Sequence, residues 1–329
     1  MNSTKQELKA ATLKSPKLTT NTIVKVLAPG TVANLVCGFD VLGMCLNEPN
    51  DLMEVKLLDE KKIIIHSADG YPLPTDPAQN TAGAPLIEMI NELDIPIGFE
   101  VTIHKRIKPG SGIGSSAASA AGSVVAANHL LGNIFSNKDL VRFAMFGEKV
   151  ASGVKHADNV APCIYGGITL IRSILPLDII SIPSPDLFVT IVHPQIEVRT
   201  KDARQILRKE VLLKDAIRQW GNIAGLVAGF MGNDLDLIGR SLEDVIIEPV
   251  RSILIPGFDE VKSKCREAGA LGGGISGSGP SIFMLSRDEA TAVKVQTVMQ
   301  EIYNRIELDF HTHVTTINKG GVRIVSDEI

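Results

Sequence analysis

The sequence predicts an α+β protein of two domains. Its 329 residues exceed the size of most single domains. Segments with strand-like and helix-like patterns are mixed, without the strict βαβ repetition that indicates a parallel sheet. Hydrophobic residues make up 44% and charged residues 21%, which is typical of a folded protein with a buried core. We expect a solvated arm at 1–20, an N-terminal domain at 21–184 and a C-terminal domain at 185–329.

The N-terminal half is predicted to begin with a strand at Thr22–Leu27, which the turn residues Ala28-Pro29-Gly30 bring to an end. Alternation predicts further strands at Asp51–Leu58, Lys61–His66 and Phe99–Ile107. The three prolines of Tyr71–Pro77 exclude regular structure there, because proline lacks the N–H group. Helices are predicted at Asn80–Leu93, Ser115–Leu131 and Asn137–Ser152.

The second half is predicted to alternate helices with short strands. Strands at Gly166–Ser173 and Leu177–Ile182 come before a boundary near Pro183–Pro185. A strand at Leu187–Val192 then opens the second domain, and helices follow at 201–209, 213–231 and 257–268. The last strands, Leu271–Ser276, Ser281–Leu285 and His311–Ile317, fit an antiparallel sheet covered by helices.

Charge and composition narrow the classes of partner. Lys and Arg number 33 against 37 Asp and Glu, giving a net charge of −4, which disfavours nucleic acid as the main partner. No run approaches the about 20 apolar residues that span a bilayer, so no membrane is expected. The N-terminus lacks an apolar signal core, and the four scattered cysteines fit reduced, buried thiols. We therefore expect a cytoplasmic protein.

The segment Lys108–Ser119, with three Gly and four Ser between a strand and an Ala-rich helix, is the sharpest chemical signal. Its glycines allow tight turns and close approach of a ligand, and the helix start favours an anion. Phosphate suits this geometry best; a flexible loop before a capped helix is the alternative. Ser115 or Ser116 would cap the helix or face a metal ion. No Lys follows the last Gly, so this is no Walker A loop, and Lys105 or Lys108 is left to help neutralise phosphate.

A second glycine motif matches the dinucleotide-binding pattern in its letters but not in its structural context. Gly272, Gly274 and Gly277 spell G-x-G-x-x-G, but the predicted helix comes before them and the strand after. A dinucleotide site requires strand, loop and helix in that order. We interpret Ile275–Ser281 as a turn of small residues that packs close to another loop or to a ligand.

Three segments carry a resemblance to a known family. Pro109–Ala117 (P-G-S-G-I-G-S-S-A) resembles the phosphate loop of the GHMP small-molecule kinases, and Ile275–Ser281 (I-S-G-S-G-P-S) resembles their third motif. Ala28–Gly43 (A-P-G-T-V-A-N-L-V-C-G-F-D-V-L-G) resembles their first motif in its homoserine kinase form. Lys155–Pro162 (K-H-A-D-N-V-A-P) and Glu248–Arg251 (E-P-V-R) also resemble homoserine kinases. The resemblance spans about residues 22 to 325.

Two departures from the family pattern lie in the first motif. Val32 stands where Ser is usual, and Val36-Cys37 where Gly-Pro is usual. We expect these changes to alter loop packing more than chemistry. The resemblance implies a ribosomal-S5-like N-terminal domain and a ferredoxin-like C-terminal domain, with the site between them. It also implies transfer of the ATP γ-phosphate to the side-chain hydroxyl of L-homoserine, with Mg²⁺, on the route to threonine.

The resemblance assigns roles to individual residues. Nucleotide contacts fall on Asn80 and on the loop Lys108, Pro109, Gly110, Ser111, Gly112, Ile113, Gly114, Ser115 and Ser116. Metal contacts fall on Ser116 and Glu148. Substrate contacts fall on Asn34, Asp40, Thr200, Arg204 and Arg251, with the two arginines on the carboxylate, because the planar guanidinium binds carboxylates bidentately. Glu148, His156 and Asn159 are implied in catalysis.

Each of these side chains also has an ordinary structural interpretation. Glu148 is by default an exposed helical carboxylate, Arg204 lies in a charged stretch, and Arg251 could pair with a surface carboxylate. A lone histidine such as His156 is more often structural, and Asn80 could simply cap its helix.

The sequence does not show which group, if any, removes the proton from the acceptor hydroxyl. Mevalonate and galactose kinases place an Asp where homoserine kinases, and this chain at Asn159, have Asn, which takes no proton at neutral pH. Asp158 is adjacent, but neighbouring side chains on a helix or strand point in different directions. We hypothesise that no side-chain base is needed, because a loose transition state asks little of the nucleophile.

The sequence leaves three other functions open. Another GHMP kinase would keep the phosphate loop and change the acceptor pocket. A non-catalytic regulator would lose the metal ligands, yet Ser116 and Glu148 are both present. An S5-like RNA-binding module would need a basic, aromatic face, and aromatic residues are only 4%. The oligomeric state stays open, with a homodimer as one option.

Overall fold

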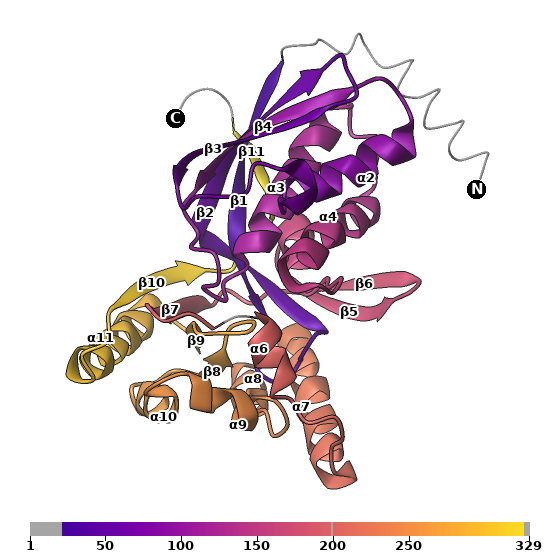
Figure 1. Ribbon diagram of the computed structural model, residues 1–329. Coiled ribbons are helices and arrows are strands. Elements are labelled where there is room, and N and C mark those ends of the chain that lie inside the picture. Colours follow the sequence, from indigo (N-terminus) through magenta and orange to yellow (C-terminus); the bar gives the residue numbers. More distant parts are fainter. Residues whose placement is uncertain (1–21, 199, 326–329) are drawn as a thin grey trace.

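Two antiparallel-rich sheets, one per domain, organise the molecule, and helices pack on both (Figure 1). The computed structural model describes residues 22–198 and 200–325. The predicted arm at 1–20 therefore lies outside the described residues. The domains meet along a continuous apolar core that includes strands and helices of both.

The first sheet has seven strands, in the order β11-β1-β2-β4-β3, with β5 paired to β2 and β6 paired to β5. These are β1 (Ile23–Ala33), β2 (Leu42–Leu58), β3 (Ile63–Gly70), β4 (Gly98–Lys105), β5 (Ile168–Ile174), β6 (Leu177–Ile182) and β11 (Arg323–Val325). All pairs are antiparallel except β3 with β4. Segment 323–325, at the end of the expected C-terminal domain, thus belongs to the first sheet.

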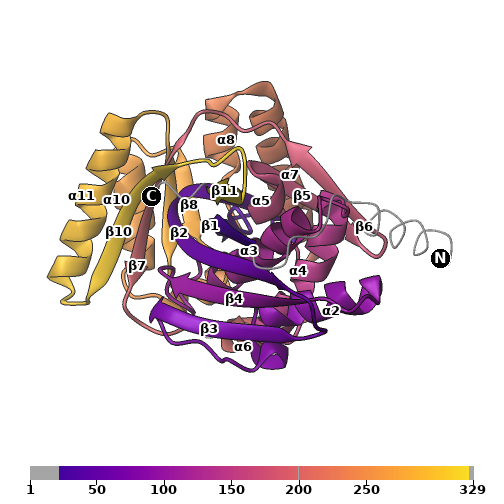
Figure 2. The ribbon, with the colours of Figure 1, turned by 90° about the horizontal axis from the view of Figure 1, so that it is seen from above.

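Helices cover one face of this sheet (Figures 1 and 2). They are α2 (Gly83–Leu93), α3 (Ser115–Leu130), α4 (Asn137–Ser152) and α5 (Val160–Tyr165), and a 3₁₀ turn at Pro77–Gln79 precedes α2. The Ala-rich α3 packs on β1 and β2 and is buried on nearly every side, which its small side chains allow. This burial holds the N-terminus of α3, and the glycine loop before it, at a fixed place.

The second sheet has the order β10-β7-β9-β8 and is antiparallel throughout, which confirms the predicted sheet type. Its strands are β7 (Phe188–Pro194), β8 (Gly272–Ile275), β9 (Ile282–Ser286) and β10 (Phe310–Thr316), and α10 (Phe258–Glu267) and α11 (Glu289–Arg305) pack against them. The chain order β7-α10-β8-β9-α11-β10 is the ferredoxin-like arrangement. Between β7 and α10 the chain inserts α6 (Thr200–Gln205), α7 (Leu213–Gly232), α8 (Leu235–Ser241), α9 (Glu248–Arg251) and a 3₁₀ turn at Ser252–Leu254.

The first strand differs from its prediction. Pro29 and Gly30 do not end β1, which continues to Ala33 through a shift of register between Pro29 and Thr31. A β-bulge accommodates the proline, because the residue left unpaired at the bulge interrupts the hydrogen-bond ladder at the point where proline cannot donate. The strand therefore carries the first motif directly to the edge of the site.

Candidate active site

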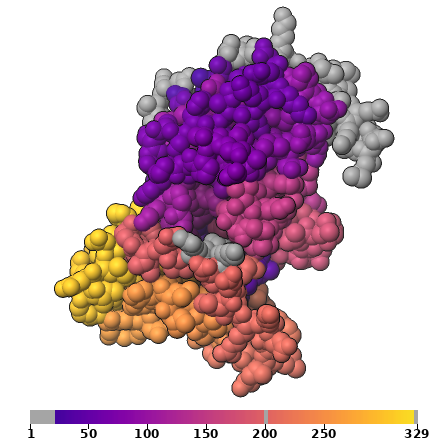
Figure 3. Space-filling model, viewed as in Figure 1, coloured from indigo at the N-terminus to yellow at the C-terminus, as the bar shows by residue number. Residues whose placement is uncertain are grey.

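A cleft of about 550 Å³ lies between the domains, and the surface is hollowed there in the space-filling view (Figure 3). The first domain lines most of it; Glu197, Val198, Arg204, Arg251, Gly277 and Ser278 come from the second. The cleft brings together fourteen of the predicted site residues, namely Asn34, Asp40, Asn80, Pro109, Gly110, Gly112, Gly114, Ser115, Ser116, Glu148, His156, Asn159, Arg204 and Arg251. Lys108, Ser111 and Ile113 do not line it. The side chain of Thr200 lies outside the described residues, and only its backbone, at the start of α6, is described.

The glycine loop enters α3 through three left-handed glycines. The φ angles of Gly110, Gly112 and Gly114 are 75°, 83° and 71°, values that favour glycine. Gly114 is the N-cap and no described side chain caps the helix, so of the two alternatives given for Ser115 or Ser116 the helix cap is wrong. The first-turn N–H groups of α3 therefore stay available at the cleft, as an anion requires.

Lys105 has a structural role. Its buried ammonium donates to the carboxylate of Asp51, to the carbonyl of Ser115 at 2.6 Å and to the hydroxyl of Ser119 at 2.9 Å. These bonds use all three of its donors, so Lys105 has no N–H left to donate to a phosphate, although it lines the cleft. Lys108 donates to the side-chain oxygen of Gln195 at 2.8 Å and so ties the loop to the second domain.

The third motif packs directly on the glycine loop, which confirms the interpretation of Ile275–Ser281 as a close-packed turn. The hydroxyl of Ser276 donates to the carbonyl of Gly112 at 2.7 Å, and that of Ser281 to the carbonyl of Ser111 at 2.6 Å. A Cβ on Gly112 would lie 2.6 Å from the carbonyl oxygen of Gly279, so only glycine allows this approach.

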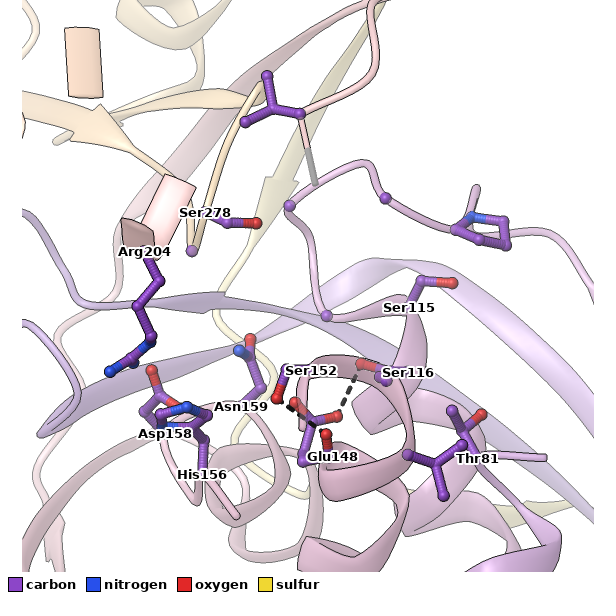
Figure 4. Close-up of a pocket in the computed structure, with 18 of the residues that line it drawn as sticks. Thr81, Ser115, Ser116, Glu148, Ser152, His156, Asp158, Asn159, Arg204 and Ser278 are labelled. Atoms are coloured by element: carbon purple, nitrogen blue, oxygen red, sulfur yellow. Dashed lines mark hydrogen bonds between the residues drawn. The ribbon is translucent and has the colours of Figure 1, made fainter. Parts of the chain in front are cut away.

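Ser116 lies in the first turn of α3 and Glu148 lies within α4, and their side chains are in contact (Figure 4). The hydroxyl of Ser116 donates to Oε1 of Glu148 at 2.7 Å. Glu148 is buried, not exposed as helical glutamates usually are, and burial raises the pKa of its carboxyl although the Ser116 hydrogen bond lowers it. A hydroxyl and a carboxylate beside a glycine loop are the ligand types that Mg²⁺ accepts, since it takes oxygen ligands and completes its shell with phosphates and water.

The other end of the cleft carries charged side chains. Both carboxylate oxygens of Asp40 accept from Arg204, at 2.8 Å each. Arg251 is 4% exposed and donates to the carbonyl oxygens of Ala203 at 3.0 Å and Gly277 at 3.2 Å. Among the described residues no carboxylate lies within ion-pair distance of Arg251. Burial, together with the charge of Arg204, lowers the pKa of Arg251 to about 10.

Asn34 fixes the loop that presents Asp40. Its side-chain oxygen accepts from the backbone N–H of Asp40 at 3.0 Å, and its amide donates to the carbonyl of Gly277 at 2.8 Å. Both residues have left-handed backbones, with φ of 73° and 61°, which this hydrogen bonding maintains. Asn80 is similarly engaged, accepting from Ala82 and Gly83 and donating to Pro74. Asn80 thus anchors the turn before α2, although the N-cap of that helix is Ala82 and not Asn80 as its structural interpretation held.

His156, Asp158 and Asn159 lie in the turn before α5 and line the cleft together (Figure 4). Asn159 accepts from the hydroxyl of Thr31 at 2.7 Å. Burial lowers the pKa of His156, so its ring is neutral near pH 7, and its Nε2 has no partner among the described residues. Burial, reinforced by Asp40 and Glu148, raises the pKa of Asp158 to about 7.

Several residues that line the cleft were not among the predicted site residues, and Asp158 and Phe39 are the two with the clearest chemical consequence. Asp158 was expected to point away from the position of Asn159, but both line the cleft, because alternation of side chains does not hold in a turn. Phe39 lines it too, with both arginines near its ring. Its place in the G-F-D sequence next to Asp40 was the available signal.

Two broader features are absent from the described part of the chain. No helix within 22–198 and 200–325 combines the length and apolar character needed to cross a membrane. The same ranges contain no cluster of three or more His, Cys, Asp or Glu side chains arranged to hold a metal ion.

Comparisons with known proteins agree with this architecture. The model of the GHMP kinases N-terminal domain matches residues 81–167, and that of the GHMP kinases C-terminal domain matches 222–305. A homoserine kinase of Chloroherpeton thalassium is 46% identical over 91% of this chain and 98% of its own length. The crystal structure of homoserine kinase from Cytophaga hutchinsonii is 49% identical, with a TM-score of 0.88, covering 92% of this chain and 97% of that one. A mevalonate kinase of L. major, 15% identical with a TM-score of 0.69 over 91% of this chain and 97% of that chain, shares the fold.

Proposed function

Because the chain belongs to the GHMP kinase family, with homoserine kinases among its relatives, we propose that it transfers the γ-phosphate of ATP to L-homoserine. The acceptor is the side-chain hydroxyl, and the product is O-phospho-L-homoserine, an intermediate toward threonine. The enzyme is then an ATP-dependent phosphotransferase that acts on an alcohol group.

One observation carries the choice of acceptor: the cleft holds a buried guanidinium, Arg251, beside an Asp40–Arg204 ion pair. A buried cation without a carboxylate partner is costly, and an anionic ligand group relieves that cost. Homoserine supplies both an ammonium for Asp40 and a carboxylate for the two arginines. An uncharged sugar would leave Arg251 without a carboxylate at ion-pair distance among the described residues.

The glycine loop is the evidence for binding of the nucleotide at the other end of the cleft. Its left-handed glycines and the open first turn of α3 suit the β- and γ-phosphates, because backbone N–H groups and the helix dipole stabilise negative charge. Ser116 and Glu148 would hold Mg²⁺, which neutralises the charge that develops on the phosphates. Phosphoryl transfer depends mostly on this positioning and neutralisation.

The acceptor hydroxyl is oriented by the turn that carries His156, Asp158 and Asn159. Thr31 holds the side-chain oxygen of Asn159, and this leaves its amide as a donor toward the hydroxyl. We keep the hypothesis that no side-chain base is required and that the proton leaves late, to phosphate or to solvent. A cytoplasmic location and a homodimer also stay predictions.

The acceptor is tested by ADP release with L-homoserine and its two truncated analogues, 4-hydroxybutyrate and 3-aminopropan-1-ol. We expect turnover with L-homoserine and a loss of at least about 100-fold in kcat/KM with either analogue, because each lacks one of the two charged groups that the cleft side chains are proposed to bind. Equal turnover of 4-hydroxybutyrate, which lacks the ammonium, would contradict the role given to Asp40. Equal turnover of 3-aminopropan-1-ol would contradict the roles given to Arg204 and Arg251.

A further inference from the structure

Phe39 lies at the meeting point of the two cleft arginines. The guanidinium carbon of Arg204 is 5.3 Å from the centroid of the Phe39 ring, and that of Arg251 is 4.9 Å from it. Both distances fall within the about 6 Å over which an aromatic ring attracts a cation. Phe39 is partly buried and lines the cleft.

The two guanidiniums need such a partner because they repel each other. The charge of Arg204 is among the causes that lower the pKa of Arg251. Asp40 compensates Arg204 with both its oxygens, whereas the hydrogen bonds of Arg251 to described residues go to the carbonyls of Ala203 and Gly277 and to no carboxylate. The electron-rich face of a ring adds attraction for both cations without adding a negative charge that would compete with a ligand carboxylate.

The ring itself is held at a fixed place. The loop between β1 and β2 is closed by hydrogen bonds from Gly38 to the carbonyl of Asn34, at 2.8 Å, and from Leu42 to the carbonyl of Gly38, at 2.9 Å. The bond from Asp40 to the side chain of Asn34 adds a third link on the other side of Phe39. The loop therefore presents Phe39 and Asp40 together, with little freedom for either to turn away.

We propose that Phe39 is a positioning residue for the acceptor: its ring holds Arg204 and Arg251 side by side so that together they bind the substrate carboxylate. This inference rests on the proposed function, in which the acceptor is an amino acid. Phe39 does not touch the reacting atoms, so its effect falls on acceptor binding and not on the chemical step.

The test compares Phe39→Leu, which removes the ring, with Phe39→Tyr, which keeps it. We expect Phe39→Leu to raise KM for L-homoserine about tenfold, from the loss of two cation–π contacts in a desolvated site. KM for ATP and kcat should change by less than about twofold, and Phe39→Tyr should stay close to the wild type. Phe39→Met serves as a second variant without a ring in case Phe39→Leu folds poorly.

Phe146→Leu is a matched control. It removes a ring that has the ammonium of Lys155 over it at 3.3 Å but does not line the cleft, so KM for L-homoserine should not change. An unchanged KM in both Phe39→Leu and Phe39→Met, with turnover intact, would overturn the role of Phe39 alone. Wild-type enzyme that neither turns over L-homoserine nor binds it in calorimetry would overturn the proposed function and this inference with it.

Discussion

At the scale of single residues, the site depends on carboxylates that the fold buries beside their partners. Glu148 is the clearest case, because its one side-chain hydrogen bond among the described residues comes from Ser116. Replacing Glu148 by Gln should lower kcat at saturating Mg-ATP by at least about 100-fold, since the amide is neutral. Steady-state kinetics at several Mg²⁺ concentrations measures this. Activity within tenfold of the wild type would contradict the metal role.

The same variant should be at least as stable as the wild type at pH 8. Burial raises the pKa of Glu148, so the folded state holds the proton more tightly than the unfolded chain does. Ionised Glu148 therefore costs stability as pH rises from its unfolded pKa through its folded pKa, and Gln removes that cost. Thermal melts at pH 8 distinguish this loss of activity from a loss of folding.

Substitution of Asp158 tests the hypothesis that no side-chain base is required. Burial raises its pKa to about 7, so the wild type loses stability from this group as pH rises from about 4 to 7, by at most about 1.4 kcal/mol per pH unit. Asp158→Asn should therefore gain Tm relative to the wild type between pH 5 and pH 8. Its kcat should stay within about tenfold. A thousandfold loss, together with disappearance of a kinetic inflection near pH 7, would identify Asp158 as a general base.

The motifs predicted many of the individual site residues. Contacts between side chains that the fold brings together from distant parts of the chain were the least predictable. The sequence placed Ser116 and Glu148 on one metal only through family resemblance, because 32 residues separate them. Lys105 was expected near phosphate because of its charge and its nearness to the loop. Its pairing with Asp51, 54 residues away, depends on how β4 pairs with β2, which no local pattern shows.

At the scale of elements, the central feature is the contact between the glycine loop and the third motif. Gly110 and Gly112 offer a matched pair of substitutions to test it, since both have positive φ. A Cβ on Gly110 meets nothing within 4 Å, whereas one on Gly112 meets two carbonyl oxygens at 2.6 and 2.7 Å. Each change to Ala carries a backbone cost of about 1–2 kcal/mol, and Gly112→Ala adds the clash.

Thermal melts should therefore rank the wild type above Gly110→Ala and Gly110→Ala above Gly112→Ala. Stability is the better measurement here, because Gly110 lines the cleft and a methyl group there could also meet the nucleotide. Equal Tm values for the two variants would mean that the packing of the two loops contributes nothing to stability.

Elements with a clear period were predictable, and those defined by long-range pairing were not. Helix α4 and strand β6 have the predicted bounds. Helix α11 was not predicted, although its buried Val295, Met299 and Ile302 have helical spacing that could have revealed it. Strand β11 has only three residues and exists because β1 offers it an edge, so its sequence carried too little signal.

At the scale of the whole molecule, the cleft proposed as the active site lies where the two domains meet. The first domain contributes the glycine loop and the Ser116–Glu148 pair proposed to hold Mg²⁺, and the second contributes Arg204 and Arg251. The domains are joined by the Lys108–Gln195 hydrogen bond, by the return of β11 to the first sheet and by the shared core. The α+β class and the antiparallel second sheet were predictable from the order of elements. The cleft was not, because it arises from residues distant in the chain.

The most direct measurement identifies the phosphorylated product in a competition. L-homoserine, mevalonate and galactose are supplied at equal concentrations with limiting Mg-ATP, and ³¹P NMR with mass spectrometry identifies the phosphate ester formed. We predict that O-phospho-L-homoserine takes nearly all of the transferred phosphate. Phosphorylation of mevalonate or galactose instead, or release of inorganic phosphate without any ester, would contradict the account.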